Sequence, residues 1–168
     1  MINVAIALAP VVAFLVMLAL MDSFRLVRPA SILAALGYGA ASAAAVLWLH
    51  QWLLRAGHVA PAILTRYVAP LTEETAKAAF IAGLVATARV GFLVDTAVLG
   101  FAVGTGFALF ENLSYLQSMP DATVLVWVVR GLGTAMLQGA TTAIFAMLSS
   151  SSARLPPDSR WIITATTK

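Results

Sequence analysis

Three glutamates and two basic residues of this chain stand inside long apolar runs, where charged side chains are rare. Glu73, Glu74 and Lys77 lie together in LTEETAKAAFIAGLV, Glu111 follows GFAVGTGFALF, and Arg130 lies in VVRGLGT. A charged side chain at the centre of a bilayer costs roughly 2.5–3.5 kcal/mol on insertion scales, so such residues normally face the interior of a helix bundle and function there. Repulsion between neighbouring carboxylates makes it easier for one of them to bind a proton. Such a carboxylate can act as a general base that takes a proton from water.

The same residues have a purely structural interpretation as salt bridges that lock the helices together. Glu73 or Glu74 would pair with Lys77, and Glu111 would pair with Arg130. Buried charges are normally paired in this way. Three carboxylates outnumber two cations, so the pattern predicts at least one glutamate that is available for chemistry.

The composition indicates that these residues belong to an integral membrane protein. Of the 168 residues, 61% are hydrophobic and only 10% are charged, whereas a soluble domain has roughly 25% charged residues. The absence of cysteine excludes disulfides, zinc–thiolate sites and iron–sulfur clusters. The net charge of +3 is small, and the basic residues lie mainly between apolar runs, so they report membrane orientation rather than nucleic-acid binding.

Five segments are long and apolar enough to cross a membrane as helices of about 20 residues. They are residues 2–21, 30–54, 67–88, 92–117 and 123–148. We therefore predict an all-α fold, a polytopic membrane helix bundle of about five transmembrane helices. Residues 1–148 would form a single transmembrane domain and residues 149–168 a polar, flexible C-terminal tail. The first segment lacks a basic start and a small-residue cleavage site, which favours a retained span over a signal peptide.

The basic residues also predict an orientation. Cytoplasmic loops carry the excess of Lys and Arg. With the N-terminus outside, the outer loops hold Arg55 and Arg66, and the inner segments hold Arg25, Arg28, Arg89, Arg154, Arg160 and Lys168. We expect a protein of a prokaryotic inner membrane with its N-terminus outside and its C-terminus in the cytoplasm.

Helical spacing predicts that polar residues of the last three expected helices converge. At about 100° per residue, each of these helices gathers its polar residues on one face, and polar faces in lipid must meet one another. In residues 67–88 this face holds Glu73, Glu74 and Lys77. In residues 92–117 it holds Gly100, Gly104, Phe107, Glu111 and Tyr115, and in residues 123–148 it holds Arg130, Thr134 and Gln138. In a straight helix Gln138 lies roughly 10 Å deeper than the other groups, so a tilt or a break near RGLG is needed to bring it level with them.

The histidines and tryptophans have plainer interpretations. His50 and His58 lie at or beyond the end of residues 30–54, so we expect both at the membrane interface. Trp48, Trp52 and Trp127 are expected to face the interface or the lipid.

Several ways of cutting a peptide bond inside a membrane are excluded by pattern. The chain has no H-E-x-x-H zinc motif, no G-x-S-x-G nucleophile elbow and no serine and histidine placed as a nucleophile pair. Asp95 is the only aspartate in or near an inner span, so a paired-aspartate site is not expected. Water activation by glutamate is the peptidase chemistry that remains.

The stretches EETAK and GTGFALFENLSY, in this order and at this separation, resemble the PrsW family of intramembrane proteases. That family is related to the CAAX-type prenyl endopeptidases. Further matches at Pro10, Asp22, Asp95 and Arg130 extend the resemblance over residues 10–145. It implies an intramembrane peptidase that cleaves membrane-anchored proteins by glutamate-activated water, with site-1-type regulatory cleavage of substrates such as anti-sigma factors.

The resemblance also implies roles for individual residues. Glu73 and Glu74 would include the base, tuned by Glu74 or Lys77, while Glu111 and Asn112 would position water or polarise the scissile carbonyl. An asparagine amide is a suitable oxyanion donor in a dry site. The supporting residues are Phe107, Arg130 and Thr142. No cofactor and no metal are expected, although carboxylates alone could hold a hard cation.

One position departs from the family pattern. The family has a histidine eight residues after the arginine, followed four residues later by threonine; here these positions are Gln138 and Thr142. Glutamine can hydrogen-bond to water, but it cannot take up a proton near neutral pH or bind a metal as imidazole does. Three explanations compete: an engineered inactivating change, a natural variant that uses Gln138 only for positioning, or a pseudoenzyme. We expect impaired activity.

Two other functions fit the same polar faces. A proton- or cation-coupled transport subunit could use the carboxylates as an ion path, although the chain lacks the internal repeat typical of such proteins. A non-catalytic scaffold could retain the polar faces and bind substrate-like helices.

Overall fold

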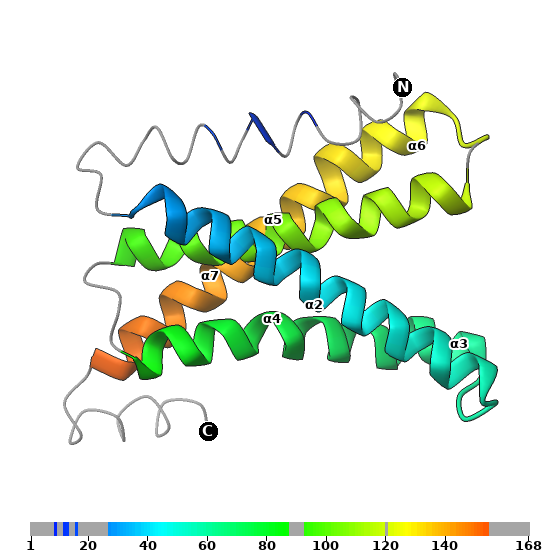
Figure 1. The fold of residues 1–168 in the computed structure, drawn as a ribbon, viewed down its shortest axis with the longest axis horizontal. Helices are drawn as coiled ribbons and strands as arrows, with labels where there is room; N and C mark the ends of the chain where they lie inside the picture. Colours follow the sequence, from blue (N-terminus) through cyan, green and yellow to red (C-terminus); the bar gives the residue numbers. More distant parts are fainter. Residues whose placement is uncertain are drawn as a thin grey trace, which may run out of the picture.

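The computed structural model describes residues 27–87, 93–119 and 121–154, together with Ala9, Val12, Ala13 and Val16. The first expected span, with Pro10 and Asp22, lies outside these residues apart from the four isolated positions. Within the described residues the chain is helical and contains no strand. The elements are α2 (Pro29–Arg55), α3 (Pro61–Ile63), the π-helical η1 (Leu64–Val68), α4 (Ala69–Ala86), α5 (Leu93–Ser118), α6 (Val124–Val128), the π-helical η2 (Val129–Thr134) and α7 (Ala135–Arg154) (Figure 1).

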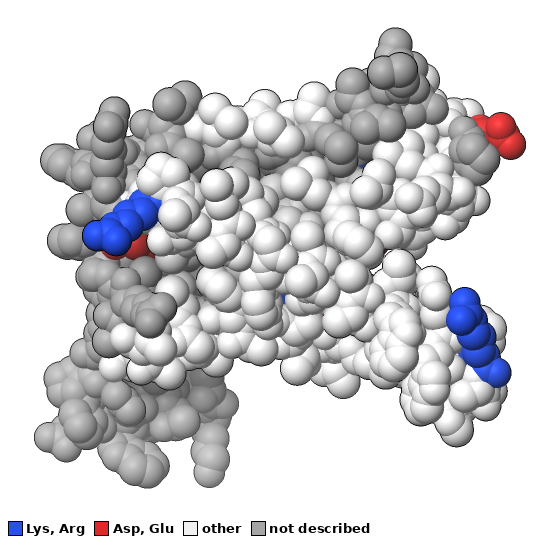
Figure 2. Space-filling model, in the orientation of Figure 1, with Lys and Arg blue, Asp and Glu red and all other residues white. Residues whose placement is uncertain are grey.

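The long helices confirm the predicted all-α membrane bundle. Three described stretches are long and apolar enough to cross a membrane: Pro29–Arg55, Leu93–Ser118 and Val124–Ala153. Figure 2 shows a broad face with almost no charge over the middle of the molecule and charged side chains toward its two ends. This distribution matches a protein whose middle lies in hydrocarbon and whose ends meet water.

The expected span at residues 67–88 begins earlier than predicted. Elements α3, η1 and α4 follow one another from Pro61 to Ala86 without a break. Proline is favoured at the first position of a helix, which explains the start at Pro61. The π turn lies just before Pro70, whose missing amide hydrogen cannot complete the normal α-helical ladder.

Helix α5 is the centre of the bundle. It packs most extensively against α7 and α2, and α4 contacts α2 and α7, so the four long helices form a four-sided bundle. The close approach depends on glycine. A Cβ atom at Gly104 would overlap the backbone carbonyl of Gln138 on α7, and one at Gly39 would overlap the carbonyl of Val103 on α5.

Two expectations about individual segments are corrected by the structure. Helix α7 continues to Arg154 rather than ending at residue 148. Serine permits this because its hydroxyl can bond within the helix, as Ser151 does in donating to the Leu148 carbonyl at 2.9 Å. Trp127 does not face lipid: its side chain is 0% exposed, whereas that of Trp48 is 69% exposed. The remaining tail, from residue 155 onward, lies outside the described residues.

Candidate active site

Two side chains from the last helical stretch hold the Glu111 carboxylate of α5. Arg130 Nη2 lies 3.2 Å from Glu111 Oε1, and Gln138 Nε2 donates to Glu111 Oε2 at 3.3 Å. The two partners are eight residues apart, yet they reach the two oxygens of one carboxylate. The predicted break near RGLG is present as the π-helical η2. A π turn takes up more residues than an α turn, so Arg130 and Gln138 lie closer along the axis than in a straight α-helix.

Lys77 links this group to α4. Its ammonium donates to Glu74 Oε1 at 2.6 Å and to Gln138 Oε1, and it lies 5.0 Å from the centre of the Phe107 ring. Lysine only donates and an ionised carboxylate only accepts, so the contacts fix which end of the Gln138 amide faces each neighbour. Gln138 therefore bridges Lys77 and Glu111 with both ends of its amide in use.

Arg130 is held in turn by two residues of α5. Its Nε donates to Asn112 Oδ1 at 3.2 Å, and its guanidinium carbon lies 3.6 Å from the centre of the Tyr115 ring. Asn112 is 1% exposed, and its amide nitrogen has no hydrogen-bond partner among the described residues. This leaves a buried amide donor next to the Arg130 side chain.

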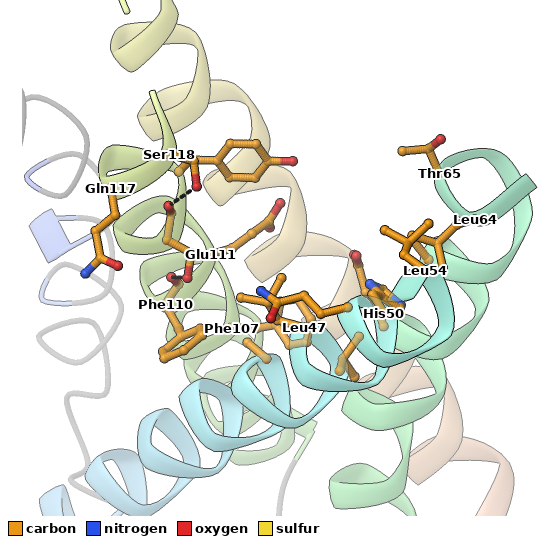
Figure 3. A pocket seen from close by; sticks show the side chains of 17 residues that line it. Leu47, His50, Leu54, Leu64, Thr65, Phe107, Phe110, Glu111, Gln117 and Ser118 are labelled. Carbon is orange, nitrogen blue, oxygen red and sulfur yellow. Dashed lines mark hydrogen bonds between the residues drawn. The ribbon is translucent and has the colours of Figure 1, made fainter. Parts of the chain in front are cut away.

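A cavity of about 420 Å³ opens between α2, α4 and α5, and both Glu73 and Glu111 line it. Figure 3 shows Glu111 in this cavity with Phe107 and Phe110 of the same helix. Glu73 lies within electrostatic reach of Glu111, Lys77 and Glu74 and close to the Gln138 amide. Among the described residues Glu74 and Glu111 form salt bridges and Glu73 forms none. Glu73 is thus the surplus carboxylate, and it faces a cavity.

Glu74 faces a different hollow, although it follows Glu73 directly. Its side chain is 60% exposed, and it lines a hollow between α4 and α7 together with Lys77, Thr142 and Phe145. Thr142 is buried, and its hydroxyl donates to the Gln138 carbonyl at 2.8 Å. The nine predicted site residues thus lie on α4, α5, η2 and α7. They divide into residues that line the cavity and residues that support them.

The sequence-based interpretation missed His50. It was expected at the membrane interface, but its side chain is 8% exposed, and it lines the cavity that contains Glu73 and Glu111. The sequence does contain a signal for this position. The buried face of α2 recurs every three or four residues, at Ala35, Gly39, Ala43, Val46 and His50.

The donor set does not suit a metal ion. Among the described residues, no group of three or more His, Asp or Glu side chains is placed to hold one. The ammonium of Lys77 and the guanidinium of Arg130 already lie against Glu74 and Glu111, so a divalent cation would have to displace two positive charges. The Gln138 oxygen accepts from Lys77, and an amide oxygen does not replace imidazole as a transition-metal ligand.

Comparison with known proteins identifies the family. A family model described as PrsW family intramembrane metalloprotease matches residues 27–166. No curated protein and no solved structure matches the chain. The matched range covers most of the chain and includes every residue of the polar cluster and of the cavity. The chain therefore belongs to the PrsW family of intramembrane proteases and is an integral membrane protein.

Proposed function

We propose that this chain hydrolyses peptide bonds of membrane-anchored proteins and that Glu73 is the base that activates water. One observation carries the proposal. Of the three clustered glutamates, Glu73 alone has no salt bridge among the described residues, and it lines a cavity beside Glu111. A carboxylate whose charge is not already neutralised by a fixed cation is the better proton acceptor.

The neighbouring residues have positioning roles in this proposal. Glu111, held by Arg130 and Gln138, would orient the water that Glu73 deprotonates. The hydroxide so formed adds to the scissile carbonyl, whose oxygen becomes negatively charged. Asn112 and Arg130 do not line the cavity themselves. Asn112 accepts from Arg130, and Arg130 holds Glu111 in place.

The family description names a metalloprotease, but the donor set here does not fit a metal, and the proposed mechanism contains no metal step. Gln138 fits a positioning residue, because Lys77 and Glu111 use both ends of its amide. It has no proton to exchange near neutral pH. We therefore propose an active but slow enzyme, with site-1-type cleavage of membrane-anchored regulators as its use.

The test is cleavage of a single-span peptide in liposomes by the purified protein and its Glu73→Gln variant. General base catalysis typically contributes about 10²- to 10⁴-fold, so kcat of Glu73→Gln should fall by about that factor. Glu74→Gln is the matched control, because it makes the same atomic change one residue away on the exposed side. It should lose less than about tenfold, since it removes the partner of Lys77 and not the base.

Equal losses in the two variants would contradict the assignment of Glu73. The thermal stability of each variant in detergent shows whether a loss of cleavage comes from the missing base or from an unfolded protein. The same liposomes loaded with a pH-sensitive dye test the transport alternative. Proton flux that Glu73→Gln abolishes, in the absence of any peptide cleavage, would replace the peptidase proposal with an ion path.

A further inference from the structure

His50 is a titratable side chain of the cavity that the proposed mechanism does not use. It projects from α2, whereas Glu73 and Glu111 project from α4 and α5. Figure 3 shows His50 on one wall of the cavity and Glu111 on another. A substrate segment between these walls would have carboxylates on one side and an imidazole on the other.

Thr72 determines which ring nitrogen of His50 carries the proton. Thr72 Oγ1 lies 2.8 Å from His50 Nε2, 2.8 Å from the Val68 carbonyl oxygen and 3.0 Å from the Ala69 carbonyl oxygen. A hydroxyl has one proton to donate, and the two carbonyls can only accept it. The hydroxyl therefore accepts from His50, whose neutral form has its proton on Nε2. Nδ1 then has a free lone pair and no protein partner among the described residues.

Peptide hydrolysis needs a proton for the leaving amine, and the two basic side chains of this site already have other partners. Lys77 donates to Glu74 and Gln138 and does not line the cavity. Arg130 cannot give up a proton near neutral pH, and its guanidinium covers the Tyr115 ring. Of the groups facing His50 across the cavity, Glu73 and Glu111 are carboxylates that the proposed mechanism uses for water.

We infer that His50 is a catalytic residue, the general acid that protonates the leaving amine through Nδ1 while Thr72 holds Nε2. This inference rests on the proposed function and adds the second proton carrier to it. Glu73 takes a proton from water as the hydroxide adds to the carbonyl carbon. That proton passes from Glu73 through cavity water to Nδ1 of the neutral His50. The C–N bond then breaks, its electron pair goes to nitrogen, and His50 Nδ1–H gives the proton to that nitrogen. Glu73 and His50 are then back in their starting states.

A structural role for His50 makes a different prediction. In that case its only task is to tie α2 to α4 through Thr72. The variant His50→Gln separates the two roles, because the glutamine amide can reach the Nε2 position and donate to Thr72 but has no proton carrier at Nδ1. His58→Gln is the matched control, since His58 is exposed, does not line the cavity and packs at an angle against Trp52.

The first experiment compares two leaving groups in liposomes. One substrate is a single-span peptide, and the other is the same peptide with a thioester at the cleaved bond, whose thiolate departs without a proton. We expect His50→Gln to lose about 100-fold in kcat on the amide, within the usual range for general acid catalysis, and less than tenfold on the thioester. His58→Gln should cleave both like the wild type. Equal losses on the two substrates, or no loss on the amide, would overturn the acid role.

The second experiment does not depend on activity. The chain has two histidines, so ¹⁵N spectra of histidine-labelled protein in detergent micelles resolve them, and His50→Gln assigns the signals. We expect neutral His50 to be protonated on Nε2, and Thr72→Val to produce a mixture of tautomers. An Nδ1–H tautomer in the wild type would overturn the inference. A wild-type chain that cleaves neither peptide refutes the proposed function and the acid role with it, whereas cleavage that His50→Gln matches refutes the acid role alone.

Discussion

At the scale of residues, Glu73 and Glu74 are adjacent in the sequence but differ in surroundings. Their helical positions differ by about 100°, which turns one into the cavity and the other toward a hollow at α7. The sequence predicted that the charged residues would converge and that one carboxylate would be in surplus. The sequence could not predict which glutamate this would be, because that depends on which carboxylate the Lys77 ammonium contacts in the folded chain.

Changing Gln138 to histidine should raise the rate of cleavage. An imidazole has two ring nitrogens, so it can accept from Lys77 and donate to Glu111 as the amide does. Unlike the amide, it also exchanges a proton near neutral pH. We expect Gln138→His to increase kcat on a model membrane substrate by about tenfold or more, whereas Gln138→Asn, which is too short to bridge both partners, should lower it. Equal or lower turnover in the histidine variant would refute the idea that Gln138 limits activity.

Chelators should leave cleavage by the wild-type chain unchanged. Lys77 and Arg130 supply the positive charge that a metal would bring, and the Gln138 oxygen is engaged by Lys77. We therefore expect the same initial rate before and after dialysis against EDTA or 1,10-phenanthroline. A known zinc peptidase in the same liposomes shows that the chelator reaches the membrane site. Loss of activity that added Zn²⁺ restores would establish a metal centre and overturn the metal-free mechanism.

At the scale of elements, the ends of two long helices were predictable and those of the other two were not. Residues 30–54 and 92–117 match α2 and α5 to within a residue at each end, because apolar length alone sets such spans. The π-helical η1 and the early start at Pro61 were missed, since they follow from how Pro70 is accommodated after helix formation. The predicted break near RGLG was required by the depth of Gln138, and η2 supplies it.

Replacing Gly104 with alanine should damage both stability and cleavage. A Cβ atom there would overlap the Gln138 backbone, so α7 would have to move away from α5 and carry Gln138 away from Glu111. Overpacking of this kind typically costs about 1–3 kcal/mol, and we expect a lower thermal midpoint in detergent and a loss of cleavage. Gly83→Ala is the control, because nothing lies within 4 Å of its added Cβ atom. A Gly104→Ala protein as stable and active as the wild type would show that the α5–α7 contact does not position the site.

At the scale of the whole molecule, an apolar middle separates two ends that have different roles. The cavity lies toward the end where α2 and α5 finish, near the turns at residues 56–60 and 121–123. Helix α7 ends at the opposite end, where α2 begins (Figure 1). Composition predicted the membrane class directly, because 10% charged residues cannot cover a water-facing surface. Which end faces the cytoplasm depends on the distribution of arginines, and several of these lie outside the described residues.

Single cysteines should decide this orientation, and with it the side from which substrates reach the cavity. The chain contains no cysteine, so each variant carries one reactive thiol and the parent protein is an unlabelled control. His58→Cys and Asp121→Cys mark the cavity end at exposed positions, and Ser152→Cys marks the other end. Because basic residues favour the cytoplasmic side, a membrane-impermeant maleimide added to intact cells should label the first two, and Ser152→Cys only after permeabilisation. The reverse pattern would place the cavity toward the cytoplasm and remove outward-facing regulators from the candidate substrates.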